Sequence, residues 1–352
     1  MKRKFIESFA SLLLALLIGF LVSAIFIIAI GVNPFVAYRE LLKGAFWGKV
    51  NIIITLRWTI PYLVVGLASA VAIKAGVFNM GLDGCIYLGA LSAALVGAYI
   101  TGLPSIIHIL LCLVVSMIVG IIWTFIPAWL KAYHNINEVI MTWMLSYIAI
   151  LLCQYLVTNY FQRSEDIIQA VQQVRTPPIL DSAKLKQIVK PYQLSSGLYI
   201  ALFAALCFYI FYNKTIKGYE HTMTGLSPKF AEYAGINVKK IQFTALLSSG
   251  AIAGLAGAIE VLGVHYRYIH GFSSNMGANG IMVSLMGRLS PIGISIASLF
   301  MGGIQNGARA MARETNVSLD TMQIFIAVIV ICITAEGLYE ILKIKPKMRE
   351  GD

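Results

Sequence analysis

The sequence is dominated by apolar runs that are long enough to cross a lipid bilayer and that recur from one end of the chain to the other. A transmembrane helix needs about 20 mostly apolar residues, and a helix satisfies its own backbone polar groups where there is no water. The sequence therefore predicts an all-α fold, a polytopic transmembrane helix bundle of about ten spans in a single domain, residues 1–352. The predicted spans are 9–32, 52–73, 84–101, 104–130, 138–160, 197–213, 241–263, 278–290, 291–309 and 321–342.

One of these apolar runs, 278–290, is too short to cross a bilayer alone. Non-helical backbone at membrane depth is tolerated only where it is buried in protein or faces a polar cavity. This run therefore predicts a broken or re-entrant helix.

Charge is scarce and its placement is informative. Only 12% of the residues are charged, against about 25% in soluble domains, which excludes an ordinary globular protein. The formal net charge is +11, but the Lys and Arg residues fall mainly in the connections between apolar runs and form no aromatic-basic groove. They indicate membrane topology and give no reason to expect nucleic acid as a partner.

Both ends of the chain are basic, which predicts that both lie in the cytoplasm. The apolar run after MKRKF exceeds the core of a secretory signal, so we expect an uncleaved first span. Ten crossings then divide the chain into five spans in 9–160 and five in 197–342, with an extracytoplasmic loop at 161–196 and a cytoplasmic loop at 214–240. We expect a multi-pass protein that contacts membrane lipid.

A six-residue motif occurs twice. Asn79-Met80-Gly81-Leu82-Asp83-Gly84 is echoed by Asn275-Met276-Gly277-Ala278-Asn279-Gly280, the first on the inner side after the second span and the other on the outer side after the seventh. Two five-span halves of opposite orientation would produce this echo. Such inverted repeats place a translocation site at the repeat interface, near broken helices.

Polar residues within the apolar zone are costly and usually face a bundle interior or a cavity. Asparagines and acids can accept and donate hydrogen bonds, and two aromatic residues four apart can form a wall for a ring-shaped solute. Each residue also has a structural alternative, as a helix cap, an ion pair or packing. The candidates for a substrate pathway are Asn79, Asp83, Asn137, Glu138, Trp143, Tyr147, Asn275 and Asn279, and Glu260 is a further buried polar candidate.

The sequence gives no support for metal binding, catalysis or ATP binding by this chain. The five cysteines lie in or beside apolar segments without a metal-binding spacing, so we expect them to pack. There is no acidic pair at catalytic spacing and no serine nucleophile motif, so we expect neither a catalytic site nor a metal site. No phosphate-binding loop of the G-x-x-x-x-G-K-[ST] type is present.

The loop at 214–240 contains a short polar helix with its own start and stop signals. Ser227 is expected to cap a helix of about 8 residues whose first residue is Pro228, and Gly235 to end it in the left-handed conformation. Phe230, Ala231, Tyr233 and Ala234 are expected on one side. So short a helix is marginal alone, and it lacks the basic face of a helix that lies on lipid. Docking into a groove of another protein fits better.

The segment "GYEHTMTGLSPKFAEYAGINVKKIQFTALLSSGAIAGLAGAIEVLG" resembles the cytoplasmic loop and following helix of ABC-transporter permeases of the branched-chain amino acid/ribose type, nucleoside and simple-sugar uptake subgroup. "GVFNMGLDG", "NINEVIMTWMLSYIA" and "GANGIMVSLMGRLSPIGISIASLFMGGIQNGA" resemble the same family at matching intervals, so that the resemblance covers most of residues 60–310. The resemblance implies the permease subunit of an ABC importer that moves a nucleoside or related small sugar through a bacterial inner membrane.

The resemblance also implies partners. They are an ABC ATPase that binds the ATP, a second permease subunit (a heterodimer rather than a homodimer), and an extracytoplasmic substrate-binding lipoprotein, for which the 161–196 loop is a candidate contact. No cofactor of the chain itself is expected. The residues that would couple to the ATPase are Gly218, Tyr219, Glu220, Gly225, Leu226, Pro228, Phe230, Ala231, Ala234, Gly235 and Ile236.

The chain departs from the family pattern in three places. Thr222-Met223-Thr224-Gly225 replaces an Arg-Ala-Val-Gly run, which suggests that a charged contact to the ATPase is missing or is supplied by His221. Asp83-Gly84-Cys85 replaces Glu-Gly-Gln, and Ser146 replaces an Asn. The alternative function is an ion-coupled secondary transporter, which would need Asp83 or Glu260 as an ion site and would leave the polar helix without a role.

Overall fold

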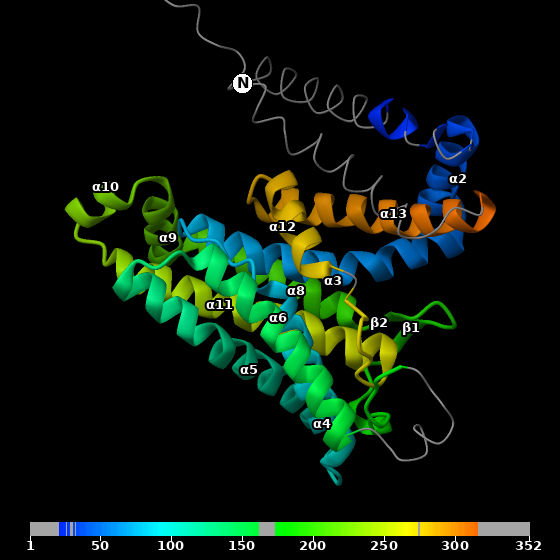
Figure 1. Cartoon of the computed structure of the whole chain (residues 1–352), viewed down its shortest axis with the longest axis horizontal. Helices are drawn as coiled ribbons and strands as arrows, with labels where there is room; N and C mark the ends of the chain where they lie inside the picture. Colours follow the sequence, from blue (N-terminus) through cyan, green and yellow to red (C-terminus); the bar gives the residue numbers. More distant parts are fainter. Residues whose placement is uncertain are drawn as a thin grey trace, which may run out of the picture. The chain divides into compact units, whose positions relative to one another are not determined.

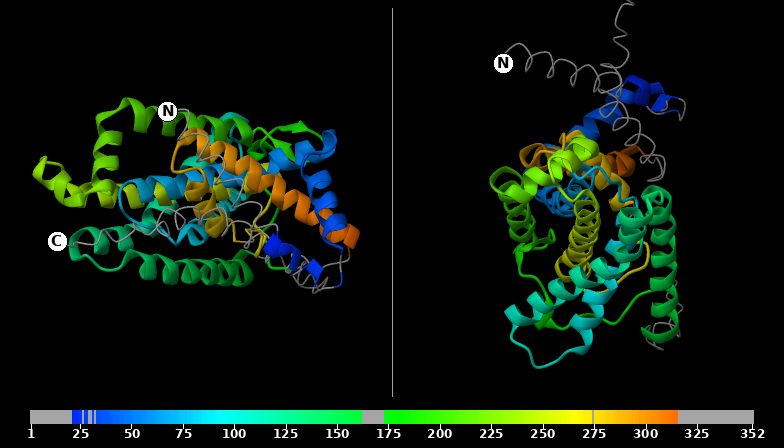
Figure 2. Two further views of the ribbon diagram at one scale, coloured as in Figure 1. Left: turned by 90° about the horizontal axis from the view of Figure 1, so that it is seen from above. Right: turned by 90° about the vertical axis from the view of Figure 1, so that its left-hand side faces the viewer.

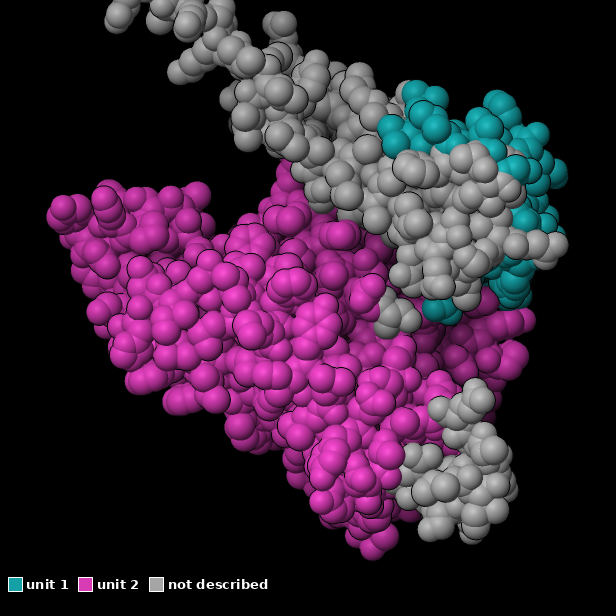
Figure 3. Space-filling model, in the orientation of Figure 1, with its two compact units in different colours: residues 1–52, 303–352 teal, residues 53–302 magenta. Residues whose placement is uncertain are grey.

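The computed structural model describes residues 21–25, 27–28, 31, 33–161, 173–273 and 275–315. They fall into two units, one of residues 1–52 with 303–352 and the other of residues 53–302 (Figure 3).

Long helices dominate the described chain (Figure 1). Six of them are long and apolar enough to cross a membrane: α3 (Lys49–Lys74), α4 (Leu82–Tyr99), α5 (Ser105–His134), α6 (Glu138–Leu156) extended by the π-helical turn η1 (Val157–Phe161), α8 (Gly197–Lys214), and α11 (Val238–Glu260) extended by η3 (Val261–His265). The other elements are α2 (Pro34–Phe46), η2 (Asp181–Ala183), β1 (Gln187–Val189), β2 (Leu194–Ser195), α9 (Ile216–Leu226), α10 (Pro228–Tyr233), α12 (Met276–Met286) and α13 (Pro291–Thr315).

The six spanning helices confirm six of the predicted spans, those at 52–73, 84–101, 104–130, 138–160, 197–213 and 241–263. The short run at 278–290 forms the short helix α12, and α13 covers 291–309. The second half of α13 carries Gln305, Asn306 and Arg309, so this helix is less apolar than the six. Most of the predicted span 9–32, and all of 321–342, lie outside the described residues.

In the unit of residues 53–302, α11 packs against α4 and α5, as the two orientations of Figures 1 and 2 show. Glycines make this contact close. A side chain at Gly254 would collide with the backbone oxygen of Ser116 on α5, and one at Gly257 with that of Ile86 on α4. The small-residue run 249–258 is therefore a tight packing surface, as its spacing predicts.

The segment 173–180 is strapped along the chain that leaves η3. The backbone N–H of Thr176 donates to Tyr268 O at 3.1 Å, and that of Ile179 to Tyr266 O at 2.8 Å. Next along the chain, β1 and β2 form a small antiparallel hairpin. The described part of the predicted 161–196 loop is thus folded onto the helix ends.

In the other unit, α2 begins where Asn33 accepts a hydrogen bond from the Phe35 backbone N–H at 2.9 Å and Pro34 takes the first helical position. The Asn-Pro pair is a helix start signal in the sequence. The helix that it begins lies between the predicted spans 9–32 and 52–73 and is not among them. The Asn306 side chain donates to Gly44 O at 2.8 Å and to Asn51 O at 3.0 Å. These bonds tie α13 to α2 and to the first turn of α3 within this unit.

Candidate functional site

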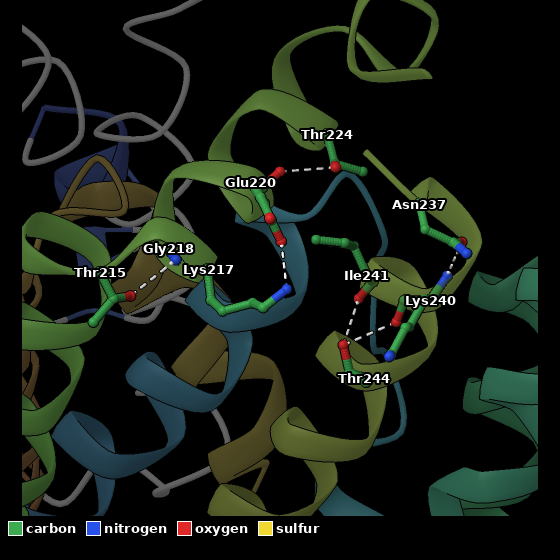
Figure 4. A network of polar contacts seen from close by, with 9 residues as sticks. All are labelled: Thr215, Lys217, Gly218, Glu220, Thr224, Asn237, Lys240, Ile241 and Thr244. Atoms are coloured by element: carbon green, nitrogen blue, oxygen red, sulfur yellow. Dashed lines mark hydrogen bonds and ion pairs between the residues drawn. The ribbon is translucent and has the colours of Figure 1, made fainter. Parts of the chain in front are cut away.

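The cytoplasmic loop predicted at 214–240 folds as two short helices with local caps (Figure 4). Thr215 caps α9 by accepting a hydrogen bond from the Gly218 backbone N–H at 3.1 Å, and Lys217 pairs with Glu220 at 2.9 Å on the same helix. Asn237 caps α11 by accepting from the Lys240 backbone N–H at 3.0 Å. Each helix of the loop is therefore fixed by its own sequence.

The start and stop signals predicted for α10 are confirmed. Ser227 accepts a hydrogen bond from the Phe230 backbone N–H at 3.4 Å, Pro228 occupies the first helical position, and Gly235 has a φ of +80°. The helix is shorter than expected, six residues rather than eight, because the chain already leaves helical geometry at Ala234.

The apolar side chains that the sequence predicts on one side of this helix differ in burial. Ala231 is fully buried, whereas Phe230 is 58% exposed and Tyr233 is 92% exposed. Leu226, just before α10, is 75% exposed, and Ala234 is also exposed. Ala231 anchors α10 to the rest of the loop, and the large side chains form an exposed apolar knob of Leu226, Phe230 and Tyr233.

This loop is pressed directly against the end of α3. A side chain at Gly225 would collide with the carbonyl oxygen of Lys74 and would lie 3.1 Å from the backbone nitrogen of Gly76. Only a glycine lets the two backbones approach this closely, because its Cα carries no side chain. The end of α9 is therefore in direct backbone contact with the turn that follows α3.

His221 points inward and does not supply an outward charge, so the hypothesis that it replaces a charged contact to a partner is wrong. Its ring lies 5.3 Å from that of Phe211 and 6.1 Å from that of Tyr212. Burial lowers the pKa of His221 from 6.5 to about 4, so the imidazole is neutral near pH 7.

The two six-residue motifs meet in space. Asp83, in the first turn of α4, accepts hydrogen bonds from the Gly277 backbone N–H at 2.9 Å and from the Ser273 hydroxyl at 2.8 Å. The Asn79 amide donates to Ser249 on α11 at 3.0 Å and accepts from the Gly81 backbone N–H at 3.0 Å. Both motifs lie where a turn leads into a helix, so Asn79 and Asp83, two of the predicted pathway residues, lie at the start of α4.

Two other predicted pathway residues have structural partners. Asn137 caps α6 by accepting from the Val139 backbone N–H at 3.0 Å. Glu138 pairs with Lys131 at 2.9 Å and accepts from the Phe78 backbone N–H at 3.4 Å. They fix the turn between α5 and α6 against the segment that precedes α4.

The aromatic pair Trp143 and Tyr147 lies on the exposed face of α6. The two rings are 5.8 Å apart, and the side chains are 53% and 56% exposed. The buried face of α6 is polar instead: Thr142 accepts from the Met80 backbone N–H at 3.0 Å, and Ser146 from the Gly84 backbone N–H at 2.8 Å.

The second motif's asparagines are less enclosed. Asn275 is exposed with a left-handed φ of 63°, and Asn279 is half-buried. The structure therefore brings Asn79 and Asp83 close to the start of α12 but leaves Trp143, Tyr147 and Asn275 on exposed surfaces.

Glu260 has a partner that is not among the residues predicted from the sequence. Arg57 on α3 donates to the Glu260 carboxylate at 3.0 Å, and His265 lies 3.6 Å from the same carboxylate oxygen. The signal was present, because Arg57 stands inside the apolar run 52–73 and a charge there calls for a partner.

Six helices that are long and apolar enough to cross a membrane place the chain among multi-pass α-helical membrane proteins. The chain belongs to the family described as the permease component of the branched-chain amino acid transport system, which matches residues 51–334. It is therefore a permease component of a transport system.

Relatives match nearly the full length. The chain is 34% identical to the guanosine ABC transporter permease protein NupP of Bacillus subtilis (strain 168), with 92% of each chain covered. It is 30% identical to the nucleoside ABC transporter permease protein NupB of Lactococcus lactis subsp. cremoris (strain MG1363), covering 95% of this chain and 93% of that one. Among solved structures, PsaBC from Streptococcus pneumoniae in complex with Fab aligns with a TM-score of 0.47 at 14% identity, over 89% of this chain and 98% of that one.

Proposed function

We propose that the chain is the membrane-spanning subunit of an ABC importer that moves nucleosides into the cytoplasm of a bacterium, driven by ATP hydrolysis on a separate ATPase subunit. The observation that carries this proposal is the apolar knob on α10. Tyr233 is 92% exposed on a helix held by Ala231, and large exposed apolar side chains on a capped loop are typical of a protein contact. The names of NupP and NupB support nucleosides as the substrate class.

The position of the knob supports a role in transmitting movement of the ATPase. The coupling residues expected from the sequence, Gly218 to Ile236, form α9 and α10, and α10 lies at the end of its unit where α3 ends and α11 begins (Figure 1). Gly225 presses on the turn after Lys74, and that turn leads to Asp83. ATPase movement at α10 would thus reach the junction between α4 and α12.

The remaining architecture is part of the proposal. We propose an inner-membrane protein of about ten spans with both ends in the cytoplasm. The spans would form two inverted halves of five. The contact between the two motifs through Asp83 and Gly277 supports this arrangement. ATP would be bound by the partner, and the chain itself would need no cofactor.

Two further partners are proposed. A second, different permease subunit is supported by the permease NupQ of Bacillus subtilis (strain 168), 24% identical to this chain, alongside the more similar NupP. An extracytoplasmic substrate-binding lipoprotein would dock on the folded strap 173–180 and the β1–β2 hairpin, which lie at the end of the unit opposite α10 (Figure 1).

The ion-coupled alternative is not favoured. Its two candidate ion ligands already have partners: Asp83 accepts from Gly277 and Ser273, and Glu260 pairs with Arg57. It also gives the exposed knob no function.

The test is uptake of radiolabelled guanosine and ribose by a strain that lacks only this chain, with and without a plasmid copy. Guanosine uptake should be lost and then restored, and it should stop when cellular ATP is depleted while the ion gradients are clamped. Unchanged guanosine uptake would refute the nucleoside assignment, and uptake that continues without ATP would refute the ABC mechanism.

A further inference from the structure

A buried ion pair joins the two most enclosed spanning helices. Arg57 on α3 and Glu260 at the end of α11 are 3.0 Å apart, with side-chain exposures of 8% and 2%. His265 lies 3.6 Å from the same carboxylate oxygen. Ionisable side chains within apolar spans are costly, and in transport proteins they mark substrate or ion pathways.

Packing alone does not explain this pair. A buried ion pair often adds no stability over apolar side chains of similar volume. Among the described residues, the Nε of Arg57 and the Oε1 of Gln187 are buried without a hydrogen-bond partner. Gln187 is nearby, because its amide donates to Gly263 O at 2.8 Å, between Glu260 and His265. The Nε–H of Arg57 and the Oε1 of Gln187 are therefore available to donate to and accept from a solute.

Aromatic rings lie next to the residues of this cluster. The Arg57 guanidinium lies 4.0 Å from the centre of the Trp58 ring. The rings of His265 and Phe272 are 5.6 Å apart, and Phe272 is 5.1 Å from Tyr87. Charged hydrogen-bonding groups beside flat rings suit a solute that combines a heteroaromatic ring with several hydroxyls.

The ion pair of Arg57 and Glu260 is enclosed in the present conformation, whereas the His265 side chain is 25% exposed. Trp58 is only 6% exposed and Glu260 only 1%. The strap is bonded to the chain directly after His265, where the Ile179 backbone N–H donates to Tyr266 O at 2.8 Å. Opening of the strap and separation of α3 from α11 would expose both charges together.

We infer that Arg57, Glu260 and His265 form a nucleoside-contacting site on the translocation pathway, near the extracytoplasmic ends of α3 and α11. This inference rests on the proposed function. The Glu260 carboxylate accepts hydrogen bonds from ribose hydroxyls, Arg57 donates to acceptors on the base, and Trp58 and Phe272 contact the ring. Without substrate, the two charges neutralise each other.

The decisive variant is the double substitution Arg57→Met with Glu260→Met, made in the complete importer with its ATPase, second permease and binding protein. It removes both charges together and keeps similar volume, so assembly and melting temperature should stay near those of the wild type. Guanosine uptake in proteoliposomes should fall about tenfold or more, the loss expected when hydrogen bonds to charged groups worth about 1.4 kcal/mol are removed. A double variant that assembles and takes up guanosine with the wild-type rate and KM would overturn the inference.

The control variant substitutes Gln for both Glu40 and Lys43 on α2, which form an ion pair 3.5 Å apart. It should transport guanosine at the wild-type rate.

A second measurement does not depend on the double variant. His265→Cys, in a Cys207→Ser background, should react with a small thiol reagent during turnover, and guanosine should protect it. Labelling that guanosine leaves unchanged would contradict the site. If the wild-type importer takes up no guanosine, the failure belongs to the proposed function.

Discussion

The carboxylate of Asp83 accepts a hydrogen bond from the backbone N–H of Gly277 at 2.9 Å, and this bond joins the first turns of α4 and α12. The two residues come from the two copies of the repeated motif and are 194 positions apart in the chain. Asp83 also accepts from Ser273, so one carboxylate organises the entry to α12. The junction is therefore a defined contact between two helix starts.

Gly277→Ala should destabilise the protein. Alanine normally improves a helix relative to glycine by about 1 kcal/mol, but here a Cβ would lie 2.6 Å from the backbone nitrogen of Asp83 and 2.5 Å from its Oδ2. We expect overpacking to outweigh the helix gain and to cost about 1–3 kcal/mol, seen as a lower melting temperature in detergent. Ala278→Ser, on the exposed neighbouring position, is the control. A melting temperature at or above that of the wild type would show that the contact between Asp83 and Gly277 relaxes around the added methyl group without loss of stability.

Tyr233→Glu should weaken binding of the ATPase subunit while leaving the permease folded. The side chain is 92% exposed, so the change breaks no internal contact. A charge in an apolar contact should reduce affinity about tenfold or more, about 1.4 kcal/mol, measured by co-purification and by binding of the purified ATPase. Ile188→Asp on β1 is the matched control, because this apolar residue is also exposed. Normal ATPase binding by Tyr233→Glu would remove the knob from the interface.

Ala231→Glu should behave differently from Tyr233→Glu. Ala231 is fully buried, and a buried carboxylate without a partner is strongly unfavourable. We expect the loop itself to open, with faster protease cleavage within 214–240 and loss of ATPase binding together. Slow cleavage at wild-type rates would mean that Ala231 does not anchor α10.

Gly225→Ala should uncouple the ATPase from transport. The added Cβ would strike the Lys74 carbonyl, and both contacting groups are backbone, so the loop has to shift away from the end of α3 at a cost of about 1–3 kcal/mol. ATPase binding should persist because the knob is intact, while uptake per ATP hydrolysed should fall. A wild-type ratio of guanosine uptake to ATP hydrolysis would show that the contact between Gly225 and Lys74 does not transmit movement of the ATPase.

Acidification should destabilise the cytoplasmic loop through His221. Its pKa is lowered from 6.5 to about 4 by burial, so between these values the unfolded state binds the proton and the folded state does not. The free energy of unfolding therefore falls as the pH drops from 6.5 towards 4. His221→Gln should remove this part of the pH dependence in thermal melts at pH 7.5 and 5. An equal pH dependence in the two proteins would show that other groups control it.

The local features of the fold were predictable because they depend on neighbours in the chain. Ser227, Pro228 and Gly235 specify the limits of α10 through backbone geometry alone, and six spans follow from the length of their apolar runs. The burial of Ala231 and the exposure of Tyr233 were not predictable. Position along the helix alone does not say which of the two side chains meets a neighbouring helix.

The sequence by itself determined that this is an α-helical membrane protein with a capped polar loop at 214–240, since a long apolar run in lipid must satisfy its own backbone groups as a helix. Tertiary structure alone decided which polar groups are satisfied by one another. Arg57 and Glu260 are 203 positions apart, and nothing in their local sequence states that they pair. The cost of an unpaired charge in an apolar bundle demands a partner, but only the tertiary fold, which brings Arg57 on α3 to the end of α11, selects it.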